Sequence, residues 1–74
     1  MRLEDAFGEQ LRKYRLDRKL TQADLALRSG VTTRYLRNLE QGLSSPTLAV
    51  IVKLAASLEV EAHELVKKSV ELTI

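Results

Sequence analysis

The chain has 74 residues, of which 45% are hydrophobic and 30% charged, and its formal net charge is +2. A chain this short supports one small domain, because it buries only about 60% of the surface that its unfolded form exposes. The absence of cysteine excludes a disulfide scaffold, a thiolate zinc site and a cysteine nucleophile, and it fits a reducing cytoplasm. The sequence lacks an apolar run of roughly 18 residues, the length of a membrane span. Its acidic N-terminus is also unlike a signal peptide. We therefore expect a cytoplasmic domain.

The charges are unevenly distributed along the chain. Residues 11–42 carry eight basic and three acidic side chains, a net charge of +5, whereas the segments on either side are slightly acidic. A basic segment of this kind indicates a polyanionic partner. Charged runs also occur on ordinary solvated helix faces, so the charge alone does not decide the function.

The first half of the chain has the spacing of three short helices. Apolar residues recur every three or four positions from Leu3 to Tyr14, which predicts a helix over about residues 4–18. Thr21 is a good N-cap for a second helix over 22–28 that ends near Gly30. Thr32 is the next N-cap, and it opens a third helix over 33–41 that ends before Gly42.

The second half predicts two more helices. A fourth helix follows Pro46 and Thr47 and extends to about Leu58, and a short fifth helix covers about residues 61–67. Five short helices without a linker or repeat make an all-α domain over residues 1–67.

Residues 68–74 have a different pattern. Val70, Leu72 and Ile74 alternate with polar residues, and this period of two is typical of a β-strand. A lone strand leaves its backbone groups without partners. A second copy of the chain would provide a partner through an antiparallel pair about a two-fold axis. The alternatives are a frayed tail or an extension of the fifth helix.

The second and third predicted helices carry the most specific signal. Two short helices joined by a tight turn at Gly30 have the spacing of a helix-turn-helix, whose second helix enters the major groove of DNA. The face of the third helix opposite Leu36 and Leu39 offers hydrogen-bond donors. An arginine pairs with guanine through two hydrogen bonds and an asparagine pairs with adenine in the same way. The pattern favours DNA binding over a merely solvated helix.

Several separated segments resemble one family in order and spacing. They are residues 20–26 (LTQADLA), 29–32 (SGVT), 36–42 (LRNLEQG), 45–48 (SPTL), 53–60 (KLAASLEV) and 64–65 (EL). These segments resemble the XRE family, the helix-turn-helix group that includes the phage lambda repressor and Cro. The resemblance covers about residues 6–66 and implies a five-helix lambda-repressor-like fold.

The resemblance also implies residue roles. Thr33, Arg34, Arg37 and Asn38 match base-contacting positions, and Gln22, Thr32, Tyr35 and Gln41 match positions that contact the DNA backbone or pack beside it. Glu40 matches an acid that pairs with an arginine of the first helix, here Arg15, which leaves Arg12 and Arg18 free. Lys19 departs from the pattern, since many members have glycine there to end the first helix.

A domain of this size contacts about half of a typical operator, so a homodimer on duplex DNA is expected. The tail residues Val70, Leu72 and Ile74 are the preferred interface, and Val50, with Leu43 and Val66 as neighbours, is the other. His63 lacks companion ligands for a metal, and neither a cofactor site nor an active site is evident. The predicted function is a transcriptional regulator, a repressor or an activator, rather than an enzyme. The alternative is an antitoxin subunit or adaptor that keeps the fold but binds little or no DNA.

Overall fold

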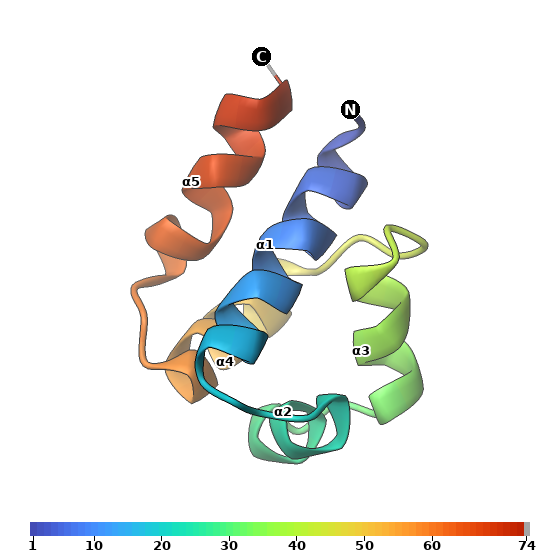
Figure 1. Cartoon of the computed structure of the whole chain (residues 1–74), viewed down its shortest axis with the longest axis vertical. Helices are drawn as coiled ribbons and strands as arrows, with labels where there is room; N and C mark the ends of the chain where they lie inside the picture. Colours follow the sequence, from blue (N-terminus) through green and yellow to red (C-terminus); the bar gives the residue numbers. More distant parts are fainter. Residues whose placement is uncertain (74) are drawn as a thin grey trace.

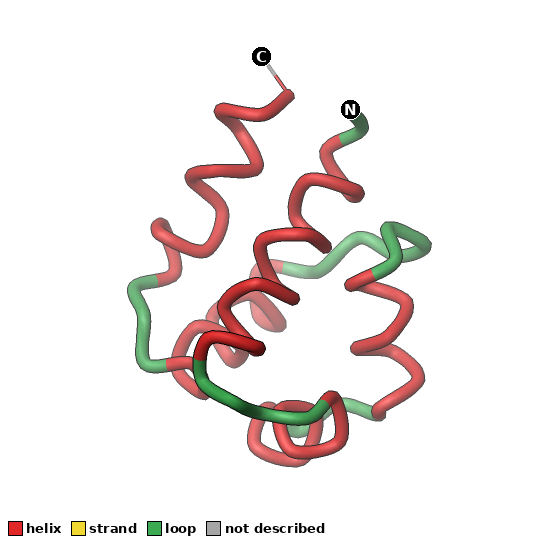
Figure 2. Tube along the Cα trace, in the orientation of Figure 1, coloured by secondary structure: helices red, strands yellow, loops and turns green. Residues whose placement is uncertain are grey.

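A computed structural model describes residues 1–73, which form five helices and no strand. Their bounds are α1 Leu3–Asp17, α2 Gln22–Ser29, α3 Thr33–Glu40, α4 Leu48–Leu58 and α5 Ala62–Thr73. Figure 1 shows α1 and α5 running side by side, with α2 across one end of the molecule and α3 beside α1. The tube in Figure 2 shows short loops between the helices, except for the longer one that joins α3 to α4. The predicted all-α, five-helix fold is confirmed for the described residues.

One small core lies between the five helices. Each helix contributes at least one fully buried leucine: Leu11, Leu25, Leu36, Leu39, Leu54, Leu58 and Leu65. Around this core α1 packs against α3 and α5, and α2 packs against α3 and α4. Leu36 and Leu39 fix α3 to the core, and Arg34 and Arg37 are left exposed on its surface. None of the described helices combines the length and the hydropathy needed to cross a bilayer.

The strand expected over residues 68–74 is wrong for residues 68–73, which continue α5 as a helix. Of the two alternatives, the helical extension is the one observed. The physical reason is packing: Leu65 and Ser69, four residues apart, are both buried on the side of α5 that faces α1. Within a helix the backbone groups are satisfied locally, whereas a lone strand would leave them unpaired. Ile74 lies outside the described residues, and the intermolecular strand pair is not retained.

A side-chain cap begins α2, and a glycine ends it. The Thr21 hydroxyl accepts a hydrogen bond from the Asp24 backbone N–H, and the Asp24 carboxylate accepts one from the Thr21 N–H. The bond from the Thr21 backbone N–H to the charged carboxylate, together with the Thr21 side chain, lowers the pKa of Asp24. Gly30 ends the helix with a φ of 70°, as the sequence predicted.

Candidate nucleic-acid interface

The turn between α2 and α3 holds α3 with one face outward. Val31 packs against the core, and its N–H donates to the Ala26 carbonyl at 3.0 Å. Leu36 and Leu39 are fully buried, and therefore the opposite face of α3 is exposed to solvent. This is the arrangement that the helix-turn-helix spacing predicted.

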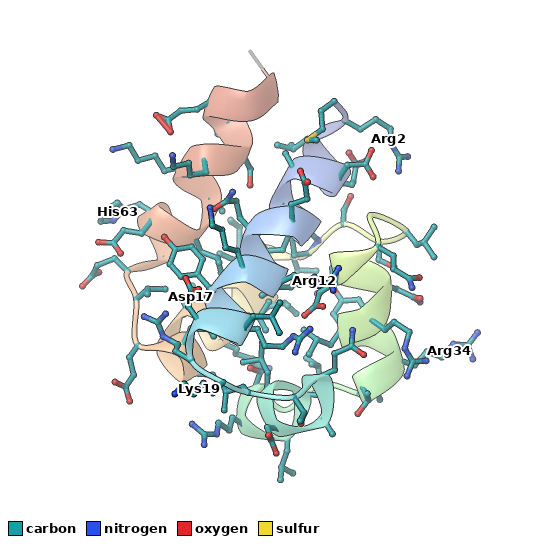
Figure 3. The ribbon with its side chains drawn as sticks, in the orientation of Figure 1. Arg2, Arg12, Asp17, Lys19, Arg34 and His63 are labelled. Carbon is teal, nitrogen blue, oxygen red and sulfur yellow. The ribbon has the colours of Figure 1, made fainter. Side chains whose placement is uncertain are left out.

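The predicted base-contacting residues lie on α3, but they differ in exposure. Arg34 and Arg37 are exposed, whereas Thr33 and Asn38 are half-buried. Figure 3 shows the Arg34 side chain extending away from the body of the molecule. The two arginines have no hydrogen-bond or ion-pair partner for their guanidinium groups among the described residues, so their donors are available to a ligand.

The residues predicted to contact the DNA backbone surround α3. Thr32 is exposed, and its hydroxyl oxygen caps α3 by accepting from the Tyr35 N–H at 3.0 Å, which leaves the hydroxyl proton free to donate. Tyr35 is half-buried and packs against the core. Gln41 is the exposed C-cap residue of α3, and Gln22 opens α2 with a half-buried side chain.

Arg15 and Glu40, predicted as an ion pair, join α1 to α3. Arg15 Nε lies 2.6 Å from Glu40 Oε2, and Arg15 Nη2 lies 3.0 Å from Glu40 Oε1. The Arg15 side chain is 9% exposed and that of Glu40 is 3% exposed. Gln22 Nε2 adds a third donor to the carboxylate at 3.2 Å, and Arg15 Nη1 donates to the Leu20 carbonyl at 2.8 Å. The carboxylate therefore connects α1, α2 and α3 at one point.

Gly8 permits the close approach of α1 to α3, a role that the sequence reasoning missed. A Cβ atom at this position would lie 2.5 Å from the Leu39 carbonyl oxygen and 2.6 Å from that of Glu40. Any side chain here would push α3 away from α1, because both obstacles are backbone atoms. A glycine inside a helical pattern is a signal for such a close approach.

Arg18 is not free, in contrast to the expectation from the resemblance. Its Nε donates to the Leu58 carbonyl at the C-terminal end of α4, and its guanidinium lies 5.6 Å from the centre of the Tyr14 ring. A cation at a helix C-terminus satisfies an unpaired carbonyl and interacts favourably with the helix dipole. Arg18 thus serves the fold by holding α4 to the end of α1.

The residues predicted for dimerisation lie in three different settings. Val50 packs against the core, so it does not face outward as expected. Val70 is 46% exposed on α5, and Leu72 is helical. Leu43 is exposed in the loop after α3, and Val66 is half-buried.

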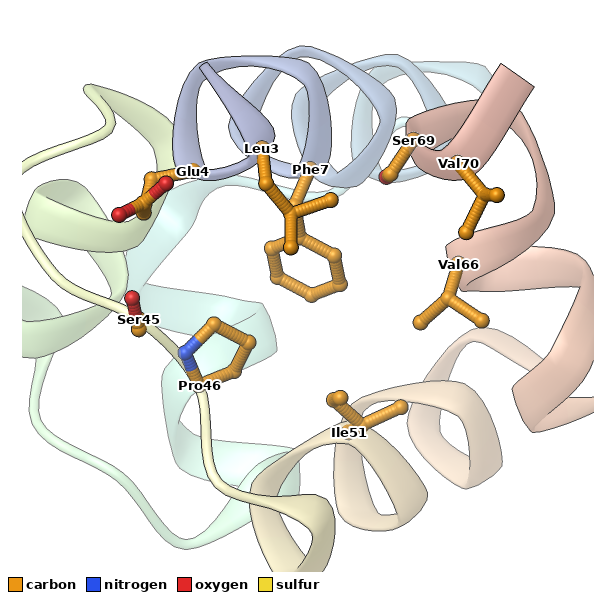
Figure 4. A pocket seen from close by; sticks show the side chains of 9 residues that line it. All are labelled: Leu3, Glu4, Phe7, Ser45, Pro46, Ile51, Val66, Ser69 and Val70. Carbon is orange, nitrogen blue, oxygen red and sulfur yellow. The ribbon is translucent and has the colours of Figure 1, made fainter. Parts of the chain in front are cut away.

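An apolar groove opens between α1, α4 and α5 (Figure 4). It has a volume of about 220 Å³ and is lined by Leu3, Glu4, Phe7, Ser45, Pro46, Ile51, Val66, Ser69 and Val70. The exposed positions of α4 are Leu48, Ala49, Val52, Lys53 and Ala56, and the two large apolar ones, Leu48 and Val52, are 82% and 59% exposed. The apolar repeat of α4 predicted Leu48 on the inner face with Leu54 and Leu58, and this expectation is wrong, because in a helix that is apolar on nearly all sides the repeat does not show which face is buried.

Nothing in the described residues suggests metal chemistry. His63 is exposed on α5 (Figure 3), and no group of three or more histidine, aspartate or glutamate side chains within residues 1–73 is arranged to hold a metal ion.

The comparisons with known proteins agree with this geometry. A family model described as helix-turn-helix (HTH_3) matches residues 11–65, most of the chain. The chain belongs to the XRE group of this helix-turn-helix family. It is 41% identical over 66 residues to the transcriptional repressor RghR of Bacillus subtilis, a match that covers 88% of this chain and 49% of RghR. The chain therefore spans about half the length of that relative.

Two solved structures of the same fold are informative. The restriction-modification controller protein C.AhdI from Aeromonas hydrophila is 37% identical, with a TM-score of 0.82, and the match covers 84% of this chain and 94% of that protein. The biofilm master regulator SinR, solved in complex with DNA, is 30% identical, with a TM-score of 0.76, and the match covers 80% of this chain and 95% of that chain. The relatives described here are regulators and not enzymes.

Proposed function

We propose that this protein is a transcriptional regulator that binds duplex DNA sequence-specifically, with α3 in the major groove. The observation that carries the proposal is the exposed, unpartnered pair Arg34 and Arg37 on a helix that the Arg15–Glu40 pair holds to α1. Arginines on a rigid helix are suited to guanine edges, while Thr33 and Asn38 supply further donors and acceptors. The related SinR, which has been solved bound to DNA, supports the same use of the fold.

We further propose that the regulator acts as a homodimer. One protomer measures 32 × 23 × 22 Å, so two protomers side by side can place their α3 helices about 34–36 Å apart, one turn of DNA. The proposed interaction surface is the outward face of α4, Leu48 and Val52, together with the groove beside Val66 and Val70. A surface helix that is apolar on nearly all sides is generally covered by another element. The core, α2 and α5 cover only the inner side of α4.

Alanine substitutions on the two helices test the proposed readout. Arg34→Ala or Arg37→Ala should weaken binding to a selected site by about 1–3 kcal/mol and relax the base preference at one position. Gln22→Ala should weaken binding to selected and mixed-sequence duplexes alike. Lys68→Ala, an exposed cation on α5, is the matched control and should change neither. The measurement is a titration of each variant against both duplexes at one fixed salt concentration.

Equal losses on both duplexes for the two arginine variants would overturn their assignment as base readers. An absence of binding to any duplex at about 50 mM salt would overturn the regulator itself. That second result would favour the adaptor or antitoxin alternative, in which the fold serves protein interactions.

A further inference from the structure

A polar hollow lies where α1, α2 and α3 meet. Six side chains line it, and all of them are charged or carry amide groups: Arg12, Arg15, Gln22, Arg37, Glu40 and Gln41. Figure 3 shows Arg12 on the side of α1 that is directed toward α3. The hollow therefore brings one exposed cation of α1 close to the helix proposed to enter the major groove.

The charges in this hollow do not cancel. Glu40, its sole acid, is already paired by two donors of Arg15 and one of Gln22. Arg12 and Arg37 have no partner for their guanidinium groups among the described residues. Two unpaired guanidinium groups and the amide of Gln41 leave an excess of positive charge and of donors. The ligand that suits them is an anion with several acceptor oxygens, such as a phosphate.

We propose that Arg12 binds a phosphate of the DNA backbone, which makes α1 a third DNA-contacting element. This proposal rests on the proposed function. A helix in the major groove has a phosphate backbone along each edge of the groove, and the groove is only about 12 Å wide. The side of α3 that faces α1 therefore meets one backbone, and Arg12 lies on that side. Arg37 lines the same hollow, so it is positioned between this phosphate and the bases.

The test compares Arg12→Gln with Lys13→Gln in the full chain. Lys13 is the next residue of α1 and is also exposed, but it does not line this hollow. Both changes remove one positive charge and keep a good helix former, and thermal unfolding of each variant checks that the fold is intact. Binding to a mixed-sequence duplex is measured between about 50 and 200 mM salt. The slope of log K against log salt becomes shallower by about 0.9 for each phosphate that the protein no longer neutralises.

Arg12→Gln should reduce the steepness of that slope by about 0.9 per bound protomer and weaken binding roughly 10-fold, whereas Lys13→Gln should leave the slope at the wild-type value. An unchanged slope in Arg12→Gln, or equal effects of the two variants, would overturn the proposal while wild-type binding still supports the proposed function. A wild-type protein that does not bind the duplex would instead overturn the proposed function.

Methylphosphonate substitution identifies the source of the phosphate. Neutralising one backbone phosphate at a time in the duplex should reveal a position that weakens wild-type binding but has no further effect on Arg12→Gln. A hollow that binds inorganic phosphate while every neutralised duplex affects the two proteins equally would show a free-anion site, and this result would overturn the proposed bond to DNA.

Discussion

At the scale of single residues, Glu40 connects the fold to the proposed function. Its carboxylate accepts hydrogen bonds from α1 and α2 although its side chain is almost completely buried. Burial of two charges is costly because both lose their hydration. The attraction between them offsets this cost only when the geometry is good and further hydrogen bonds satisfy both groups. Here the bidentate pairing with Arg15 and the hydrogen bond from Gln22 satisfy the carboxylate, so α3 is fixed relative to α1 and α2.

Removal of one partner from this pair should destabilise the domain strongly. Glu40→Ala leaves the Arg15 guanidinium buried and unpaired, and we expect a decrease of about 3–5 kcal/mol in the free energy of unfolding. The double variant Arg15→Met/Glu40→Leu should be destabilised less than Glu40→Ala alone, because no charge is left behind. Urea unfolding of the two variants and the wild type measures the difference. A double variant that is less stable than Glu40→Ala would contradict this account.

The sequence predicted one residue pairing in the site and the outward face of α3, but it missed other contacts. The Arg15–Glu40 pairing was implied by the resemblance, and the outward Arg34 and Arg37 followed from the burial pattern of α3. The hydrogen bond of Arg18 to the end of α4 had no local signal, since it joins residues 40 positions apart. Val50 was misplaced for a related reason: in a helix apolar on nearly all sides, the periodicity does not show which face is buried.

At the scale of helices, the ends were predicted more accurately than the extension of α5. Threonine caps and glycine stops are local signals, and they placed α2 and α3 to within one residue. The conformation of residues 68–73, in contrast, depended on tertiary packing, which has no local signal in the sequence. Leu65, Val66 and Ser69 fit a helical repeat, whereas residues 70, 72 and 74 fit a strand repeat, and the packing of α5 against α1 decided between them.

Lys19, like Glu59, is a non-glycine residue with a positive φ, which is a local conflict in the described part of the chain. It follows the C-cap of α1 with a φ of 57°, a conformation in which non-glycine residues are strained by about 1–2 kcal/mol. Lys19→Gly removes this strain, although glycine also gives the unfolded chain more entropy, which offsets part of the gain. The net effect should be a rise of about 0.5–1 kcal/mol in the free energy of unfolding. Gly30→Ala is the reverse control: a Cβ there has open space, but the φ of 70° strains it, so stability should fall. Both effects are measured by urea denaturation, and stabilisation by Gly30→Ala would refute the argument.

At the scale of the whole molecule, the two proposed surfaces share α1 but use different residues of it. The DNA-facing side chains lie on α3, at the start of α2 and at Arg12 of α1, whereas the apolar groove and the outward face of α4 involve Leu3 and Phe7 of α1 together with α4 and α5. A protomer can therefore bind DNA and a second copy at once. This separation was not visible in the sequence, because Leu48 and Val52 lack any local pattern that distinguishes them from core residues.

Charge on the outward face of α4 should separate the protomers. Leu48→Lys or Val52→Lys places a cation in the proposed interface and should raise the dimer dissociation constant at least about 10-fold. Leu27→Lys on α2 is the matched control, because Leu27 is 83% exposed but lies outside this surface. Analytical ultracentrifugation of the free proteins measures the effect. If Leu27→Lys raised the dimer dissociation constant as much as Leu48→Lys or Val52→Lys, α4 would not be the interface.

The most direct measurement for the whole account is selection of preferred sites from random duplex DNA with the full chain. A homodimer that reads DNA through α3 should enrich a two-fold symmetric site whose half-sites are about 10 base pairs apart, centre to centre. The Arg34→Ala variant should select a site with relaxed preference at one position of each half. Enrichment of no site, or the same site from wild type and Arg34→Ala, would contradict sequence reading by this helix.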